Sequence, residues 1–62
     1  MNPSRAMPTP SYYQNIDTGE TRPVLQWAMS YTLYQQADGT LRGYTRAGGS
    51  QPPITLRHVD TP

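Results

Sequence analysis

The sequence predicts a small, soluble all-β protein: an antiparallel meander or open barrel of about four strands that follows a disordered N-terminal tail. Three observations lead to this fold class. Large apolar and small or polar residues alternate along residues 25–33 and again along residues 54–59. Glycine-containing turn signals, Thr18-Gly19 and Asp38-Gly39, separate the predicted strands. A chain of 62 residues has room for one domain, which we place at residues 12–60.

Residues 1–11 are predicted to form the disordered tail. They contain three of the seven prolines and no aliphatic side chain larger than methionine, so little apolar surface offsets the entropy lost on ordering. The segment lacks the apolar run of a secretory signal, and no part of the chain approaches the ~18 apolar residues of a membrane span. We therefore expect no membrane partner. The location stays open, cytoplasmic by default, because a mature secreted form would look the same.

Residues 12–21 are predicted to form a hairpin, with Gly19 free to adopt positive φ at the bend. Their pattern Tyr-Tyr-x-Asn-x-x-Thr-Gly-Glu-Thr resembles the second hairpin of a WW domain and covers ten of the 62 residues. The resemblance implies a hairpin in which Tyr13 and Thr21 correspond to groove residues. It does not extend to binding of proline-rich peptides, because a WW domain carries a tryptophan soon after the final threonine and this chain has Arg22-Pro23 there.

The central stretch, residues 25–33, has the strongest periodicity in the chain. Every odd position is large and apolar or aromatic, which predicts a strand with one buried face. An α+β fold with a helix over residues 24–37 remains an alternative, because Pro23 could be the first helical residue and Gly39 could end the helix. Several residues would then share a helical face: Leu25, Ala28, Met29, Thr32, Leu33 and Gln36.

A second hairpin is predicted around Asp38-Gly39, with residues 41–46 as the returning strand. A turn made of these two residues places Leu33 opposite Tyr44, and this is the register that we prefer. A loop of three residues, 37–39, would shift the register by one position. The apolar face would then carry a different set of residues from the returning strand: Leu41, Gly43 and Thr45.

The sequence contains no catalytic, cofactor-binding or metal-binding constellation. There is no cysteine, and the lone histidine, His58, has only four acidic residues in the chain as possible co-ligands. Most of these acids fall in predicted turns or near the end of the chain, where they do not define a pocket for acid-base chemistry. No phosphate-binding loop or dinucleotide motif is present. We therefore expect a protein that is not an enzyme and has no evident small-molecule substrate.

The composition favours a protein that interacts with other chains. Only 34% of the residues are hydrophobic and there is no disulfide, so a thin aromatic core leaves surface to be covered by a protein partner or a second copy. Because Trp, Tyr and Arg dominate interface energetics, we expect a central patch with an arginine rim. The patch comprises Trp27, Tyr31, Leu33 and Tyr44, and the rim comprises Arg42 and Arg46. The alternative is that these residues are simply the core of a monomer.

A second hypothesis concerns the returning strand, where arginine and tyrosine alternate around Gly43. Such residues on a sheet face are a stacking surface for single-stranded nucleic acid. The sequence Arg42-Gly43-Tyr44 resembles the start of the RNA-binding motif of RRM domains. The formal net charge of +1 is too small to steer a nucleic acid over long distances, so any such binding would depend on local contacts.

Overall fold

The computed structural model describes residues 11–60 of the chain. It confirms the predicted fold class: among these residues, five strands and one short helix form a single open antiparallel sheet with a helical connection. The elements are β1 (Tyr12–Asn15), β2 (Thr21–Pro23), α1 (Val24–Ser30), β3 (Tyr31–Gln35), β4 (Leu41–Thr45) and β5 (Ile54–Val59). The predicted disordered tail lies outside the described residues apart from Ser11.

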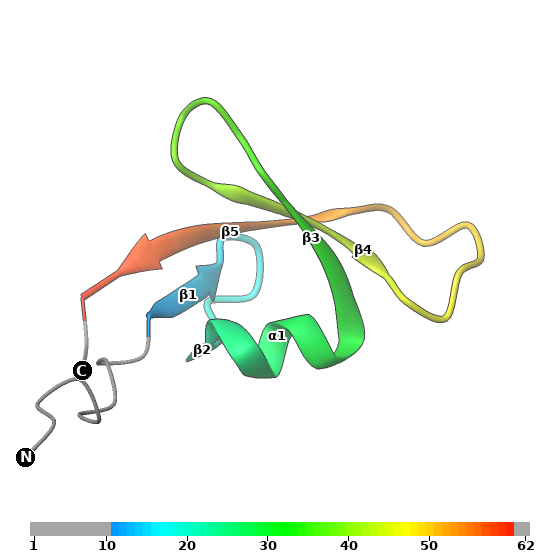
Figure 1. Cartoon of the computed structure of the whole chain (residues 1–62), viewed down its shortest axis with the longest axis horizontal. Helices are drawn as coiled ribbons and strands as arrows, with labels where there is room; N and C mark the ends of the chain where they lie inside the picture. The colour runs from blue at the N-terminus through cyan, green and yellow to red at the C-terminus, as the bar shows by residue number, and fades with distance from the viewer. Residues whose placement is uncertain (1–10, 61–62) are drawn as a thin grey trace, which may run out of the picture.

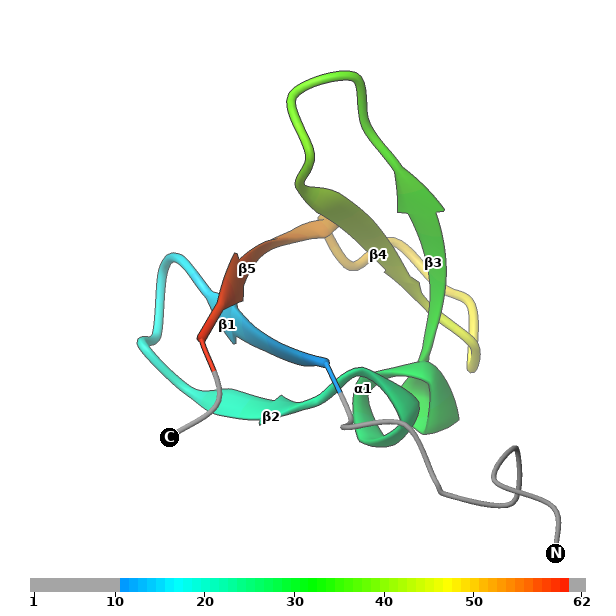
Figure 2. The same cartoon turned by 60° about the vertical axis from the view of Figure 1, so that its left-hand side comes forward.

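The strands are ordered β2-β1-β5-β4-β3, so β5 connects the two hairpins of the molecule (Figure 1). β5 pairs with β1 on one side and with β4 on the other, and both pairings are antiparallel. The sheet curves, and α1 runs directly from β2 to β3 across the open side between these two edge strands (Figure 2). Within residues 11–60 no helix has the length and hydropathy that a membrane crossing requires.

The first hairpin is confirmed, and Asn15 organises its turn. Asn15 is 6% exposed, and its side-chain Oδ1 accepts hydrogen bonds from the backbone N–H groups of Asp17 at 2.8 Å and Thr18 at 3.3 Å. Gly19 adopts φ of 80° and donates its N–H to the Asn15 carbonyl at 2.8 Å. The buried amide oxygen is therefore satisfied locally, as a polar group removed from water requires.

The prediction of a strand over residues 25–33 is wrong in its first half. Residues 24–30 form α1, and only the part from Tyr31 onward is extended. Pro23 is the residue before the helix, with φ of −59° and ψ of 146°, and not its first helical residue. The carbonyl of Ser11 accepts the Val24 N–H at 2.8 Å, so β1 and β2 hold the start of the helix. Four of the seven residues of α1 (Leu, Gln, Ala and Met) are good helix formers, and tertiary packing overrides the period-two pattern.

The alternative helix over residues 24–37 is also wrong beyond Ser30, because Tyr31 has φ of −131° and ψ of 145°. The helical face predicted for it points the wrong way as well. Trp27 is 1% exposed, whereas Leu25 and Met29 are 76% and 78% exposed. One large indole therefore anchors α1 to the sheet, and the two smaller apolar side chains face solvent.

The second hairpin uses the three-residue loop, so the preferred register is wrong by one position. Leu33 lies opposite Gly43, and the N–H of Gln36 donates to the carbonyl of Thr40 at 2.8 Å. Gly39, the third loop residue, has φ of 90°, which suits a three-residue hairpin loop with glycine in the left-handed region. Gly43 is closely packed, because a Cβ there would lie 3.0 Å from Ile54 Cγ1 and 3.2 Å from Leu33 Cδ2, so these side chains would have to shift to make room for it.

Few side chains are completely buried in the described part of the chain. Trp27 and Leu56 are the fully buried large residues, at 1% and 0% exposed. Alternation along β3 to β5 gives the sheet an inner face, which carries Leu33, Gly43 and Leu56, and an outer face with the intervening residues. The core is therefore as thin as the composition indicates, and most aromatic side chains retain some contact with water.

Candidate functional site

The six residues predicted to form an interaction patch do not form one surface. Trp27 of α1 is buried with the Tyr31 ring packed against it, and Tyr31 and Leu33 are half-buried on the inner face beside Gly43. Arg42 and Tyr44 lie on the outer face of β4, and Arg46 follows that strand. The structure therefore joins Arg42 and Tyr44 in one surface cluster but separates them from the other four residues.

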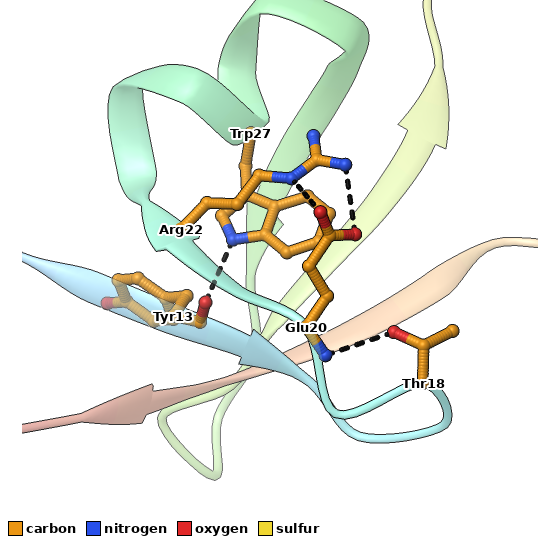
Figure 3. A network of polar contacts seen from close by, with 5 residues as sticks. All are labelled: Tyr13, Thr18, Glu20, Arg22 and Trp27. Atoms are coloured by element: carbon orange, nitrogen blue, oxygen red, sulfur yellow. Dashed lines mark hydrogen bonds and ion pairs between the residues drawn. The ribbon is translucent and has the colours of Figure 1, made fainter.

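Trp27 belongs to a fully satisfied polar network (Figure 3). Its indole Nε1 donates to the Tyr13 carbonyl at 2.9 Å, which fixes the ring against β1. The guanidinium carbon of Arg22 lies 4.3 Å from the ring centroid, a cation–π geometry. Tyr31 packs against the same indole, with ring centroids 5.9 Å apart at 58°. The network explains why Trp27 is a structural residue in this fold.

Glu20 completes this network by holding Arg22 in place. Two hydrogen bonds join them, from Arg22 Nε to Oε2 at 2.8 Å and from Nη2 to Oε1 at 2.9 Å. Hydrogen bonding from Arg22 is the main reason that the pKa of Glu20 lies below its ordinary value. The same interaction raises the pKa of Arg22. The charge of Arg22 is therefore already neutralised, and the residue is not available to a ligand without breaking this pair.

Arg46 also has a structural role. Its Nε donates to the carbonyl of Ala28 at 2.8 Å, and its backbone N–H donates to the carbonyl of Ser30 at 2.9 Å. Both acceptors lie in the last turn of α1, where carbonyl groups lack partners within the helix and a positive charge is favourable. Arg46 thus ties the end of α1 to the end of β4.

The outer face of the β3–β4 hairpin carries the surface cluster that we name the outer cluster: Tyr34, Gln36, Arg42 and Tyr44. These residues surround an open hollow of about 470 Å³. Tyr34 and Tyr44 are 55% and 45% exposed, and their rings meet edge to face with centroids 5.8 Å apart at 78°. Arg42 lies directly opposite Tyr34 across the ladder. The register therefore places one guanidinium beside two exposed phenol rings.

Arg42 differs from Arg22 because no acid among residues 11–60 forms an ion pair with it. Its Nε is buried and has no hydrogen-bond partner among residues 11–60. The nearest candidate acid, Asp38, is engaged in the hairpin loop, where its Oδ1 accepts bonds from the hydroxyl of Thr40 at 2.6 Å and from its backbone N–H at 3.0 Å. These bonds from Thr40, and more weakly the charge of Arg42, hold the pKa of Asp38 below its ordinary value. The guanidinium of Arg42 therefore lies at the hollow without a paired acid among residues 11–60.

Arg57 provides a useful contrast on the same outer face. It lies on β5, two residues after the partner of Arg42, and its Nε donates to Gln14 Oε1 at 2.9 Å. Gln14 lies opposite Arg57 across the β1–β5 ladder. Because this side-chain bond occupies the Nε of Arg57, the hollow beside Arg42 is the distinctive feature of the outer face.

No metal centre can be built from the described residues, since residues 11–60 contain no group of three or more potential metal ligands. His58 instead packs against Tyr13, with ring centroids 5.2 Å apart at 79°. This contact is an aromatic cross-strand pair on the β1–β5 ladder.

Four residues that contribute to the surface were not in the predicted patch. Tyr34 and Gln36 complete the outer cluster, and the exposed Leu25 and Met29 form an apolar pair on α1. The register of the three-residue loop would have indicated Tyr34, because it places Tyr34 opposite Arg42. The sequence does not indicate that Leu25 and Met29 are exposed, because both belong to the alternating pattern that predicts a buried strand face.

Comparisons of the chain with protein-family models, with curated proteins and with solved structures find no match.

Proposed function

We propose that this chain is a non-enzymatic interaction module that binds a partner protein through the outer cluster, with Arg42 receiving an acidic side chain of the partner. One observation carries the proposal: among residues 11–60 no acid forms an ion pair with Arg42, which lines an open hollow beside two tyrosines that are about half exposed. A partner carboxylate that enters the hollow would supply the missing opposite charge to the guanidinium.

The chemistry of the outer cluster favours a carboxylate ligand. A guanidinium is a planar fork that binds a carboxylate through two parallel hydrogen bonds, and such charge-assisted bonds are stronger than neutral ones. Tyr34 and Tyr44 add apolar ring surface to the lining of the hollow, and Gln36 adds an amide. Tyrosine and arginine in one cluster are the residue types that dominate interface energetics.

Matched peptides test this proposal directly. We would titrate the chain with two fluorescent, end-blocked hexapeptides that place either glutamate or glutamine between leucine and tryptophan. The glutamate peptide should bind more tightly, and Arg42→Gln should weaken its binding by about tenfold, because a charge-assisted pair is lost. Arg57→Gln is the matched control, since Arg57 is exposed on the same face and already bonded to Gln14. Equal affinity for both peptides, or equal losses in both variants, would contradict the proposal.

A second candidate function is binding of single-stranded nucleic acid. The exposed ring pair of Tyr34 and Tyr44 beside Arg42 favours it, because bases stack on exposed aromatic rings and on guanidinium planes. Fluorescence anisotropy with labelled oligo-U and oligo-dT at low salt provides the test. Binding should weaken as salt is added, and Tyr44→Ala should reduce affinity by about 5- to 150-fold. Absence of binding at low salt would eliminate this function.

A further inference from the structure

β3 is an edge strand, and the backbone groups on its free side can be assigned from the hairpin. In the β3–β4 hairpin the N–H of Gln36 donates to Thr40, and the N–H of Arg46 donates to Ser30. Hydrogen-bonded pairs alternate along an antiparallel ladder, so the even-numbered residues of β3 point their N–H and C=O groups toward β4. The odd-numbered residues point these groups away from the sheet: Tyr31, Leu33 and Gln35.

Most of these outward groups have no partner within residues 11–60. The N–H of Tyr31 is used, because it donates to the Trp27 carbonyl at the end of α1. No hydrogen bond within the described residues engages the N–H groups of Leu33 and Gln35 or the carbonyls of the three outward residues. Both views show β3 rising away from α1, so the second half of the strand is clear of the helix (Figures 1 and 2).

The opposite edge of the sheet, β2, is protected where β3 is not. The bonds from Asn15 to Glu20 and from Val24 to Ser11 show that Thr21 and Pro23 are the outward residues of β2. Pro23 has no N–H, which leaves one outward donor on a strand of three residues. β3 has five residues, Tyr-Thr-Leu-Tyr-Gln, with no proline and no charge. Natural edge strands are usually protected by such features, and their absence marks an edge that pairs with another strand.

We propose that the β3 edge pairs with β3 of a second copy of this chain, antiparallel and across a two-fold axis that passes through Leu33. In that register Leu33 lies opposite Leu33 of the second copy, and Gln35 lies opposite Tyr31 of the second copy. The free donors then meet free acceptors: Leu33 N–H bonds to the Leu33 carbonyl, and Gln35 N–H bonds to the Tyr31 carbonyl. The engaged N–H of Tyr31 is not needed for any of these bonds.

A second copy is favoured as the occupant because the edge complements itself. Two-fold symmetry uses each of the two free donors once per copy, so the pairing forms four backbone hydrogen bonds in total, and symmetric pairing is the commonest form of self-association. The side chains are compatible as well, since Leu33 meets Leu33 and the uncharged Tyr34 meets Thr32. Because the pairing involves one strand of five residues from each copy, we expect a weak, concentration-dependent dimer.

This inference does not depend on the proposed function. Arg42 and the tyrosine rings act on the face of the sheet, whereas the pairing uses the backbone of its edge. Either property can be lost while the other remains.

Total synthesis of the 62-residue chain permits a test that leaves every side chain unchanged. One synthetic chain carries an N-methyl group on the amide of Leu33, which removes a free donor and blocks the β3 edge. The matched control carries N-methylation on Thr21, the outward donor of the β2 edge. Sedimentation equilibrium is measured on all three chains up to about 1 mM, a range suited to weak complexes. Dispersed amide resonances and near-ultraviolet circular dichroism of Trp27 verify that each chain is folded.

The unmodified chain and the Thr21 control should rise from the monomer mass of 7.0 kDa toward twice that value with concentration. The chain modified at Leu33 should remain monomeric or dimerise at least about tenfold more weakly, since two symmetric hydrogen bonds are lost. A constant monomer mass for the unmodified chain would overturn the inference. Dimerisation that is insensitive to Leu33 methylation would also overturn it, because the interface would then lie elsewhere. As a recombinant second variant, Gln35→Pro removes the other outward donor and should give the same loss.

Discussion

Within residues 11–60, two arginines lie beside aromatic rings, and the two clusters differ in whether an acid pairs with the arginine. Arg22 lies over Trp27 and is bonded twice by Glu20, whereas Arg42 lies beside Tyr34 and has a buried Nε without a partner within the described residues. The first cluster closes the core under α1, and the second remains open on the outer face. The same residue types are therefore structural where a counter-ion is supplied and available for binding where it is not.

Local spacing accounts for the difference between the two clusters. Glu20 and Arg22 are two residues apart, so their side chains project on the same side of an extended chain and can pair. The acid nearest to Arg42 in the sequence is Asp38, but its carboxylate is held in the hairpin loop by Thr40. An acid that stabilises a turn is thus lost as a partner for the arginine on the adjacent strand.

The largest expected effect comes from removing the ring that the first cluster covers. Trp27→Ala should lower the free energy of unfolding by about 3–5 kcal/mol, because it deletes a fully buried indole and leaves a cavity. A domain of this size has only roughly 3–9 kcal/mol in total, so this loss removes a large share of its stability. Urea titration followed by circular dichroism measures the loss. Tyr44→Ala on the exposed cluster is the control and should stay folded; similar losses in both variants would remove the distinction between the clusters.

A smaller effect, of opposite sign in the two clusters, is expected when each arginine is replaced by methionine. Arg42→Met should raise the free energy of unfolding by about 1 kcal/mol, because a buried donor without an acceptor disappears while the apolar stem is kept. Arg22→Met should lower the unfolding midpoint, since the cation over Trp27 is lost and Glu20 loses its partner. Thermal unfolding of the two variants in parallel measures both shifts. Destabilisation by Arg42→Met would mean that its guanidinium already stabilises the fold.

The smallest effect concerns pH and sharpens the role of Glu20. Its folded-state pKa lies below the ordinary value of 4.5, so its ion pair stabilises the protein fully above that value. This stabilisation is lost as the pH falls through the lower folded-state pKa. Glu20→Gln should therefore weaken the dependence of the unfolding midpoint on pH below about 4.5, without abolishing it, because Asp38 shifts in the same direction. An unchanged pH profile would show that the pair contributes nothing to stability.

Much of the fold could be predicted from short-range signals. The hairpin around Gly19, the loop that ends at Gly39 and the last strand over residues 54–59 all occur where turn residues and alternation indicate them. Such signals are reliable because positive φ at a glycine and the period of two along a strand are local properties of the backbone. The candidate site was predicted less well. Arg42 and Tyr44 were identified, but the positions of Tyr34 and Gln36 depend on the register of the second hairpin, which differs between a two-residue and a three-residue loop ending at Gly39.

The sequence by itself determined an antiparallel sheet with tight turns, a thin aromatic core and the absence of disulfide chemistry. Only the tertiary structure decided that residues 24–30 are helical, that Trp27 points inward and that Leu33 lies opposite Gly43. The physical reason is that the local preferences in this stretch are nearly balanced between helix and strand. Two tertiary features then select a single arrangement. The buried indole of Trp27 donates its N–H to the Tyr13 carbonyl, and the sheet packs closely over Gly43, which has no side chain.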